Sequence, residues 1–301
     1  MFPEQNRRCP SLRIFVKNEK YYLQISNITE MQSEINSIMQ NINCQIIYGT
    51  YKADENAISL ALKFGFKNFD SASHYGNADI IYNAIKNNNI PRNEINITSK
   101  IWKDEAGYKK TQEACKKILE SLHTDYIDTL LIHWPDKNNN LNLETWNALE
   151  NLKISGLVKN IGLSNFLPHH ADIILKSCKI KPSIVQLEFH PGYMQFPAVK
   201  YFQDNNIQVQ AWSPLARGRI FNDELITGLA KKYNVTPAQI CLNFCKRENI
   251  IPIVKASDSE HFDEILNAFK FEIEQNDLWK LETMPQTGWS GEHPDRERVK
   301  I

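Results

Sequence analysis

Short apolar runs alternate with longer amphipathic segments along most of the chain, starting near residue 45. Nearly continuous apolar runs of this length are typical of parallel strands that are covered on both faces. The runs lie at residues 44–50, 67–72, 95–102, 127–135, 158–166, 184–191, 207–214 and 250–257. The pattern therefore predicts eight strands.

The segments between the runs repeat their apolar residues every three or four positions, which is typical of amphipathic helices. One such segment carries Ala57, Leu60, Ala61 and Phe64 at this spacing. Another begins with Thr236, Pro237 and Gln239, a combination that predicts an N-terminal capping box. We expect helices over residues 54–66, 111–122, 143–156 and 236–250.

Eight alternations of strand and helix over about 250 residues predict an α/β fold, a (β/α)8 TIM barrel. A doubly wound open sheet is the alternative, but the 11 glycines form neither a GxGxxG nor a GxxxxGK motif. Those motifs are the usual phosphate loops of the open-sheet folds. We expect the barrel to occupy residues 45–301, with the C-terminal tail from residue 283 over the barrel mouth.

The first 44 residues do not follow the alternation. Two short apolar runs at residues 13–16 and 21–25 flank a polar turn and predict a hairpin. Residues 28–42 predict a weak amphipathic helix. We expect residues 1–44 to form an N-terminal extension that packs on the barrel, and a partner-binding arm is the alternative.

The amino-acid composition limits the kinds of binding partner that we expect for the chain. Lys plus Arg and Asp plus Glu both number 35, and a net charge of zero argues against a nucleic-acid partner. No apolar stretch approaches the ~20 residues that span a bilayer, and the first residues lack the apolar core of a signal peptide. We therefore expect neither a nucleic-acid nor a membrane partner.

The six cysteines form no CxxC motif. Cys241 and Cys245 share a helix face, which suits a metal, but buried free thiols are the commoner state of cysteine. The sequence therefore predicts no metal site and a reduced, cytoplasmic protein. We expect a monomer, with a dimer as the alternative.

Four ionisable side chains follow or end three successive predicted strands: Asp70, Tyr75, Lys100 and His133. In (β/α)8 barrels the carboxyl ends of the strands meet at one rim, so these groups should converge there. A lysine ammonium lowers the pKa of a phenol from its usual value of about 10, and a carboxylate keeps the lysine charged. The set supplies acid–base chemistry but no electrons, so we expect a hydride-carrying cofactor.

The segment FDSASHYGN at residues 69–77 resembles a motif of the aldo-keto reductase family. Six further motifs follow in the family's order: INITSKIW, DYIDTLLIHWP, GLVKNIGLSNF, QLEFHP, QAWSPLARG and NVTPAQICLNF. The resemblance covers residues 45–290. It implies a (β/α)8 barrel that binds NADPH, less often NADH, without a Rossmann fold.

The resemblance also implies roles for individual residues. Tyr75 would donate a proton to a carbonyl oxygen, Lys100 paired with Asp70 would lower the tyrosine pKa, and His133 would orient the substrate. The implied cofactor-binding residues are Ser164, Asn165 and Gln186 at the nicotinamide carboxamide, Trp212 stacked on its ring, Ser213 and Leu215 at the pyrophosphate, and Lys255, Ser257, His261 and Glu264 at the adenosine end.

The chain departs from the family pattern at the adenosine end. Ala256 stands where the family often has serine after the lysine, and His261 stands in place of an arginine. The fork of donors that suits a phosphate is therefore absent, and Lys255 remains as a point charge. We expect NADPH as the cofactor, with NADH as the alternative.

The predicted function is NAD(P)H-dependent reduction of an aldehyde or ketone to an alcohol, or the reverse oxidation. Trp102, Trp134 and Trp289 are expected to line the substrate pocket, and aromatic walls suit an apolar or cyclic carbonyl substrate. His190 and the pair His169–His170 are expected to be structural. A non-catalytic nucleotide-sensing subunit is the alternative that the unusual first 44 residues suggest. A third alternative is a barrel isomerase that acts on phosphorylated sugars. The sequence argues against it, because no glycine-rich phosphate loop follows the late strands.

Overall fold

The computed structural model describes residues 12–17, 20–25 and 46–296 and divides the chain into two compact units, 1–44 and 45–301. In the first unit, strand β1 (Leu12–Lys17) pairs with β2 (Lys20–Ile25) in antiparallel register, with Leu12 opposite Ile25. The helix predicted for residues 28–42 lies outside the described residues. The packing of this unit on the barrel stays a prediction.

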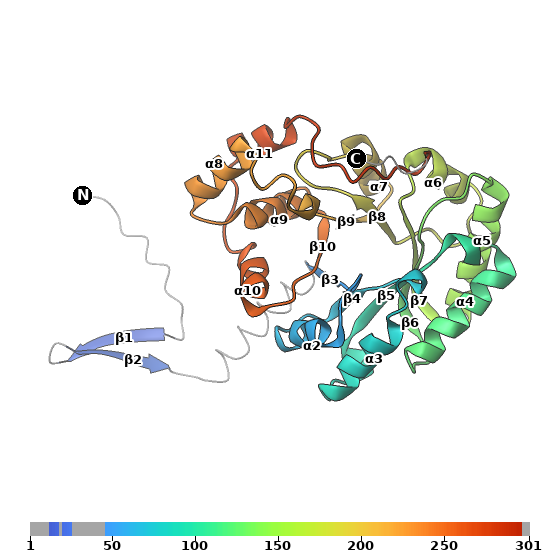
Figure 1. Cartoon of the computed structure of the whole chain (residues 1–301), viewed down its shortest axis with the longest axis horizontal. Coiled ribbons are helices and arrows are strands. Elements are labelled where there is room, and N and C mark those ends of the chain that lie inside the picture. The colour runs from blue at the N-terminus through green and yellow to red at the C-terminus, as the bar shows by residue number, and fades with distance from the viewer. Residues whose placement is uncertain (1–11, 18–19, 26–45, 297–301) are drawn as a thin grey trace. The chain divides into compact units, whose positions relative to one another are not determined.

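The second unit is a closed barrel of parallel strands (Figure 1). Each strand pairs with the next in the chain, and the last pairs with the first through Ile253 opposite Ile47. This confirms the predicted (β/α)8 barrel. The strands are β3 (Ile47–Gly49), β4 (Asn68–Asp70), β5 (Asn96–Ile101), β6 (Ile127–Ile132), β7 (Val158–Ser164), β8 (Ile184–Glu188), β9 (Gln208–Trp212) and β10 (Ile251–Val254).

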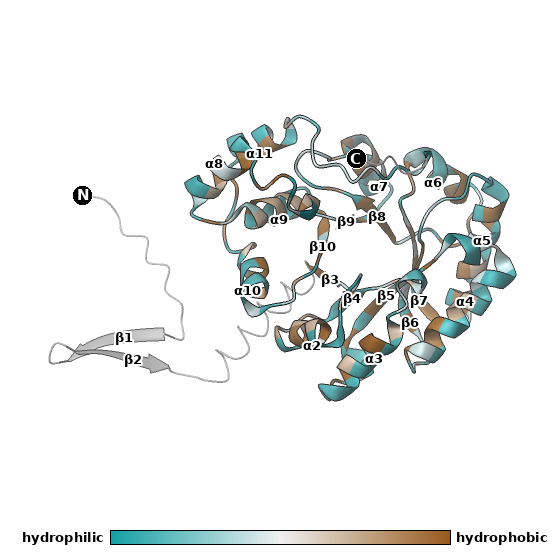
Figure 2. Ribbon diagram, viewed as in Figure 1, coloured by the Kyte–Doolittle hydropathy of each residue, from teal (hydrophilic) through white to brown (hydrophobic). Residues whose placement is uncertain are grey.

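Helices surround the barrel, and Figure 2 shows several of them with one hydrophobic and one hydrophilic side. They are α2 (Glu55–Lys63), α3 (Ala78–Asn87), α4 (Tyr108–Ser121), α5 (Asn139–Ile154), α6 (Pro168–Leu175), α7 (Phe196–Asp204), α8 (Glu224–Tyr233), α9 (Pro237–Arg247), α10 (Ser259–Asn267) and α11 (Gln275–Glu282). Helix α9 begins with both bonds of the predicted capping box between Thr236 and Gln239.

The buried face of α2 differs slightly from the predicted one. Its buried side chains are Ala57, Ile58, Ala61 and Leu62, whereas Leu60 and Phe64 are only half-buried. Phe64 follows the last helical residue and stacks on Phe262 at 5.0 Å, so it packs toward α10 rather than toward the strands.

The C-terminal tail crosses the carboxyl end of β8. Glu188 is the last residue of that strand, is buried, and accepts hydrogen bonds from Ser290 N at 2.9 Å and Ser290 Oγ at 2.7 Å. Thr287 N donates to Gly192 O at 3.0 Å, just beyond the same strand. The tail therefore lies over the barrel mouth, as predicted (Figure 1).

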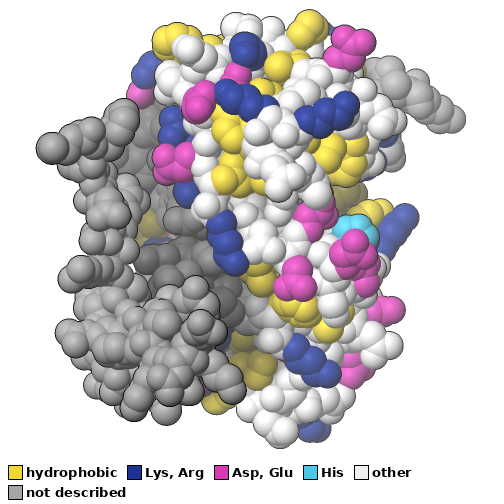
Figure 3. Space-filling model, turned by 90° about the vertical axis from the view of Figure 1, so that its left-hand side faces the viewer, with side chains coloured by type: hydrophobic (Ala, Val, Ile, Leu, Met, Phe, Trp, Pro, Cys, Tyr) yellow, Lys and Arg dark blue, Asp and Glu magenta, His cyan; other side chains and the backbone are white. Residues whose placement is uncertain are grey.

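Charges of both signs are interspersed on the side of the molecule drawn in Figure 3, where Lys and Arg lie among Asp and Glu. The described part of the chain contains no helix that is both long and apolar enough to cross a membrane.

Gly162 in β7 pairs with Ile184 in β8 and leaves no room for a side chain. A Cβ at this position would lie 2.4 Å from Ile184 O and 2.8 Å from Leu131 Cδ2. We expect Gly162→Ala to lower the free energy of unfolding by ~1–3 kcal/mol, because the strands must shift to admit a methyl group. Urea unfolding followed by circular dichroism measures this.

Gly228→Ala in α8 is the matched control, because no atom lies within 4 Å of the Cβ that it adds. It should stabilise the protein by about 0.5–1 kcal/mol, the usual helix preference for alanine. Equal unfolding midpoints for Gly162→Ala and the wild type would contradict the tight packing of β7 against β8.

Candidate active site

Neighbouring strands place a buried ion pair inside the barrel. Asp70 ends β4 and Lys100 lies in β5, and their side chains are 6% and 2% exposed. Lys100 Nζ lies 2.6 Å from Asp70 Oδ2 and donates to Ser71 O at 2.8 Å. Asp70 Oδ1 accepts from Gln186 Nε2 at 2.6 Å, so both carboxylate oxygens are engaged.

The lysine of this pair is charged. Burial acts to lower the pKa of Lys100, but the Asp70 carboxylate and the Tyr75 phenol outweigh it, and the net shift is upward. A buried ammonium is stable only with such partners. The barrel interior therefore contains a fixed positive charge.

Tyr75 ends a short 3-10 turn, Ser73–Tyr75, that directly follows β4. Lys100 Nζ lies 5.2 Å from the centroid of its ring, and the Tyr51 ring lies 5.0 Å away. Burial raises the pKa of the Tyr75 phenol, and the lowering effect of Lys100 does not offset it. The expectation of a lowered pKa is therefore wrong for the net shift, because burial penalises the phenolate more than the ammonium stabilises it.

His133 follows β6 and faces the same group. Its ring meets the Tyr75 ring edge-on at 5.9 Å and the Trp102 ring edge-on at 4.9 Å. Burial, reinforced by Lys100, lowers the pKa of His133 well below its usual value, so the imidazole is neutral. Its buried Nδ1 has no hydrogen-bond partner within the described part of the chain.

The predicted nicotinamide residues join the same network. Asn165 donates from Nδ2 to His133 O at 2.9 Å and to Ser164 Oγ at 3.2 Å, and its Oδ1 accepts from Trp212 Nε1 at 2.8 Å. Gln186 connects Asp70 to Gln210 Oε1, which lies 3.0 Å from its Nε2. Amide groups and a half-buried indole thus form networks that reach Asp70 and His133, a set that fits a nicotinamide ring and its carboxamide.

The loop after β9 contains several residues with left-handed backbone. Ser213, Ala216 and Arg217 have φ values of 51°, 47° and 55°. Ala216 N donates to Ser213 O and Gly218 N donates to Leu215 O. Turns of this kind form concave backbone surfaces that suit anions, which fits the predicted pyrophosphate contact of Ser213 and Leu215.

The predicted adenosine residues lie at the end of β10 and along α10, apart from the group around Tyr75. Lys255 Nζ donates to Tyr51 O at 3.2 Å, and Ser257 is exposed. His261 Nδ1 lies 2.6 Å from Asp258 Oδ2, a bond that raises the pKa of His261. Glu264 is half-buried, and its carbonyl oxygen accepts from Gln239 Nε2.

The three predicted pocket tryptophans lie in different surroundings. Trp102 packs on His133, whereas Trp134 is half-buried beneath Lys103, whose Nζ lies 5.2 Å from its ring centroid. Trp289 stacks on Tyr193 at 5.9 Å and donates from Nε1 to Glu292 O. Its carbonyl oxygen accepts from Arg219 Nη1 at 2.7 Å. The described contacts of Trp289 thus lie on the tail and on the loops after β8 and β9, not around Tyr75.

Several site residues were not among those predicted from the sequence. His74 stacks flat on Trp102 at 4.0 Å, Gln210 holds Gln186, and Glu188 anchors the tail. Gln210 and Glu188 could have been found, because a polar residue inside an apolar strand points to a buried partner. The stacking of His74 has no counterpart in the sequence pattern.

A model of the aldo/keto reductase family matches residues 48–284. The chain is 36% identical over 239 residues to the glyoxal reductase of Bacillus subtilis (strain 168), covering 79% of this chain and 86% of that protein. It is 30% identical over 274 residues to the methylglyoxal reductase DkgA of Escherichia coli (strain K12), covering 90% and 99%.

Solved structures give the same picture. An aldo-keto reductase from a Medee basin deep-sea metagenome library superposes with a TM-score of 0.80 at 33% identity, over 84% of this chain and 96% of that one. A variant of Gox0644 in complex with NADPH superposes with a TM-score of 0.79 at 31% identity, over 85% and 94%.

Proposed function

This chain belongs to the aldo/keto reductase family and is an NADPH-dependent oxidoreductase, and we propose that it reduces the carbonyl group of a small aldehyde or ketone with Tyr75 as the proton donor. One observation carries the proposal: the buried Asp70–Lys100 pair lies against the Tyr75 ring, which the ring of His133 meets edge-on at 5.9 Å.

The cofactor and the protein would supply different parts of the reaction. NADPH supplies the hydride that the carbonyl carbon needs. Tyr75 transfers its phenolic proton to the carbonyl oxygen, and a phenol whose pKa is raised by burial keeps that proton at neutral pH. Lys100 stabilises the phenolate that this transfer leaves, and Asp70 keeps Lys100 charged. Neutral His133 orients the carbonyl oxygen beside the phenol.

We extend the proposal to the cofactor contacts. The hydrogen bonds that join Ser164, Asn165, Gln186 and Trp212 to His133 and Asp70 support their role at the nicotinamide. Ser213 and Leu215 would hold the pyrophosphate, and Lys255, Ser257, His261 and Glu264 the adenosine end. Asp258, 2.6 Å from His261, adds a negative charge there that opposes a phosphate, so discrimination against NADH should be modest.

The substrate class rests on two observations. Relatives are named glyoxal and methylglyoxal reductases. The rings of Tyr51 and His133 contact the Tyr75 ring, Trp102 packs on His133, and His74 stacks on Trp102. Walls of flat rings accept a small planar carbonyl compound. Trp134 would extend the wall outward.

A carbonyl panel tests the proposal. We expect NADPH absorbance to fall on addition of methylglyoxal, glyoxal and aromatic aldehydes, and to fall more slowly with NADH. A parallel fluorescence titration measures cofactor binding. If NADPH binds and no carbonyl or alcohol in the panel is turned over, the nucleotide-sensing subunit becomes the better explanation.

We also propose a cytoplasmic monomer. Cys115, Cys241 and Cys245 are buried free thiols, which suits a reducing compartment. Burial raises the pKa of Cys241 to about 12, which disfavours the thiolate that a metal needs. Few large hydrophobic side chains are exposed among the described residues, which supports a monomer: Tyr51, Tyr108, Ile154, Leu157 and Trp279. Gel filtration with light scattering measures the mass.

A further inference from the structure

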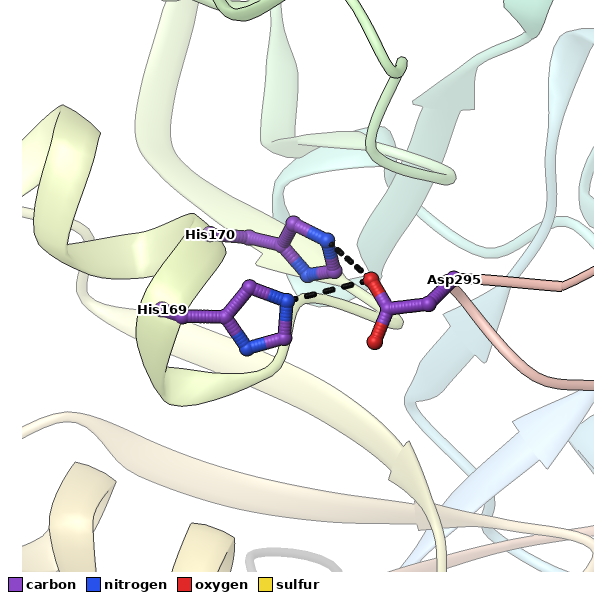
Figure 4. A group of neighbouring side chains, drawn as sticks. All are labelled: His169, His170 and Asp295. Atoms are coloured by element: carbon purple, nitrogen blue, oxygen red, sulfur yellow. Dashed lines mark hydrogen bonds and ion pairs between the residues drawn. The ribbon is translucent and has the colours of Figure 1, made fainter.

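His169, His170 and Asp295 come together where the tail meets the start of α6. His169 Nε2 lies 3.0 Å and His170 Nε2 lies 2.8 Å from the same oxygen, Asp295 Oδ1. Figure 4 shows both rings turned toward that carboxylate. The sequence could not predict this group, because 126 positions separate His169 from Asp295.

We propose that these three side chains form a binding site for Zn²⁺ or a similar divalent transition metal. Two imidazoles and a carboxylate are a donor set that zinc takes in proteins, with water in the fourth position. Zinc bonds of ~2.0–2.2 Å at tetrahedral angles place donor atoms about 3.3 Å apart. The three donor atoms already lie within 4.8 Å of one another, so modest shifts of the side chains bring them to that spacing.

The surroundings give an ion both access and a rigid support. His169 and Asp295 are 60% and 40% exposed, whereas His170 is 11% exposed. An ion can therefore enter from solvent and meet one imidazole that packing holds in place. His293 Nδ1 lies 4.0 Å from the other carboxylate oxygen, and it accepts a hydrogen bond from Asp295 N. Because that bond occupies the lone pair of Nδ1, His293 is not one of the proposed zinc ligands.

The fit has a cost that limits affinity. His170 Nδ1 accepts a bond from Leu167 N at 3.2 Å, so the neutral ring carries its proton on Nε2. Zinc at Nε2 needs that proton on Nδ1, which ends the bond to Leu167. A hydrogen bond from the second ring nitrogen of a metal-binding histidine typically raises metal affinity ~10–100-fold. Because His170 would lose its bond to Leu167, we expect a zinc dissociation constant in the micromolar rather than the nanomolar range.

Bound metal would fasten the end of the tail to α6. Glu292 and Pro294 of that segment line a small cavity together with Asn165 and Trp212. The ion would thus hold in place the part of the tail that borders the proposed nicotinamide residues. Its binding does not depend on the proposed function, since none of the three ligands is among the residues around Tyr75.

Isothermal titration of the full chain with Zn²⁺ tests the proposal. We expect one saturable site, weakened by at least about tenfold in Asp295→Asn and in His169→Asn. His123→Asn is the matched control, because His123 is exposed, packs on Tyr82 and lies outside the group, and it should bind as the wild type does. Excess Mg²⁺, which prefers oxygen ligands, should not compete.

Two results would overturn the site. One is the absence of saturable binding at micromolar zinc to the wild type. The other is wild-type affinity in both Asp295→Asn and His169→Asn while circular dichroism shows them folded, which would place the ion elsewhere. Carbonyl reduction by zinc-free protein is measured separately, so failure here leaves the proposed function untouched.

Discussion

Tyr75→Phe is expected to lower kcat for carbonyl reduction by ~10²–10⁴-fold, the usual contribution of a positioned general acid. The variant removes only the phenolic oxygen, and its ring keeps the edge-on contacts with His133. Because the Asp70–Lys100 pair does not depend on that oxygen, the protein should fold and bind NADPH nearly as the wild type does. Steady-state kinetics with the best carbonyl of the panel, with NADPH affinity from fluorescence, measure both effects.

Tyr51→Phe is the matched control. Tyr51 is 52% exposed, and its ring lies 5.0 Å from that of Tyr75, so the two variants lose the same atom in neighbouring rings. Tyr51→Phe should keep a kcat near that of the wild type. A full rate in Tyr75→Phe would remove the assigned proton donor, and equal losses in both variants would indicate a general disturbance of the pocket.

Lys100→Met is expected to lower the free energy of unfolding by about 3–5 kcal/mol, because it leaves the buried Asp70 carboxylate without its cation. Gln186 Nε2 remains on Oδ1, but a single amide does not replace the ammonium on Oδ2. Reduction should also be lost, since no charge stabilises the Tyr75 phenolate. Denaturant unfolding gives the stability change, and single-turnover measurements on the folded fraction give the rate.

The exposed ion pair of Lys67 and Glu94 is a control for this variant, because its N···O distance equals that of the buried pair. Lys67 Nζ lies 2.6 Å from Glu94 Oε2, as in the buried pair, but these side chains are 45% and 48% exposed. Lys67→Met should therefore cost only ~0–1 kcal/mol. Similar losses in the two variants would show that burial does not decide the strength of the Asp70–Lys100 pair.

Adding Asp70→Asn to Lys100→Met tests the cause of the instability. The double variant should recover part of the lost stability, because the unpaired carboxylate is then neutral. It should not recover carbonyl reduction. An additive loss of stability would mean that the two side chains do not act as a pair.

The strand order and the group around Tyr75 could be predicted because both depend on position along the chain. Asp70, Lys100 and His133 end or follow adjacent strands of a parallel barrel, so their sequence positions fix which rim they share. The sign of the Tyr75 pKa shift could not be predicted, since it depends on how much neighbouring rings bury the phenol. The contacts of Trp289 and Asp295 could not be predicted either, because they depend on the path of an irregular tail.

The pairing of β10 with β3 joins segments from opposite ends of the barrel sequence, and Tyr48 Oη donates to Ala256 O across 208 positions. During synthesis the ring of strands therefore stays open until the last strand has left the ribosome. Such a large sequence separation slows folding, because the entropy of a long loop is lost before its contacts form. Until then the edges of β3 and of the latest strand to emerge are unpaired, and unpaired strand edges favour aggregation.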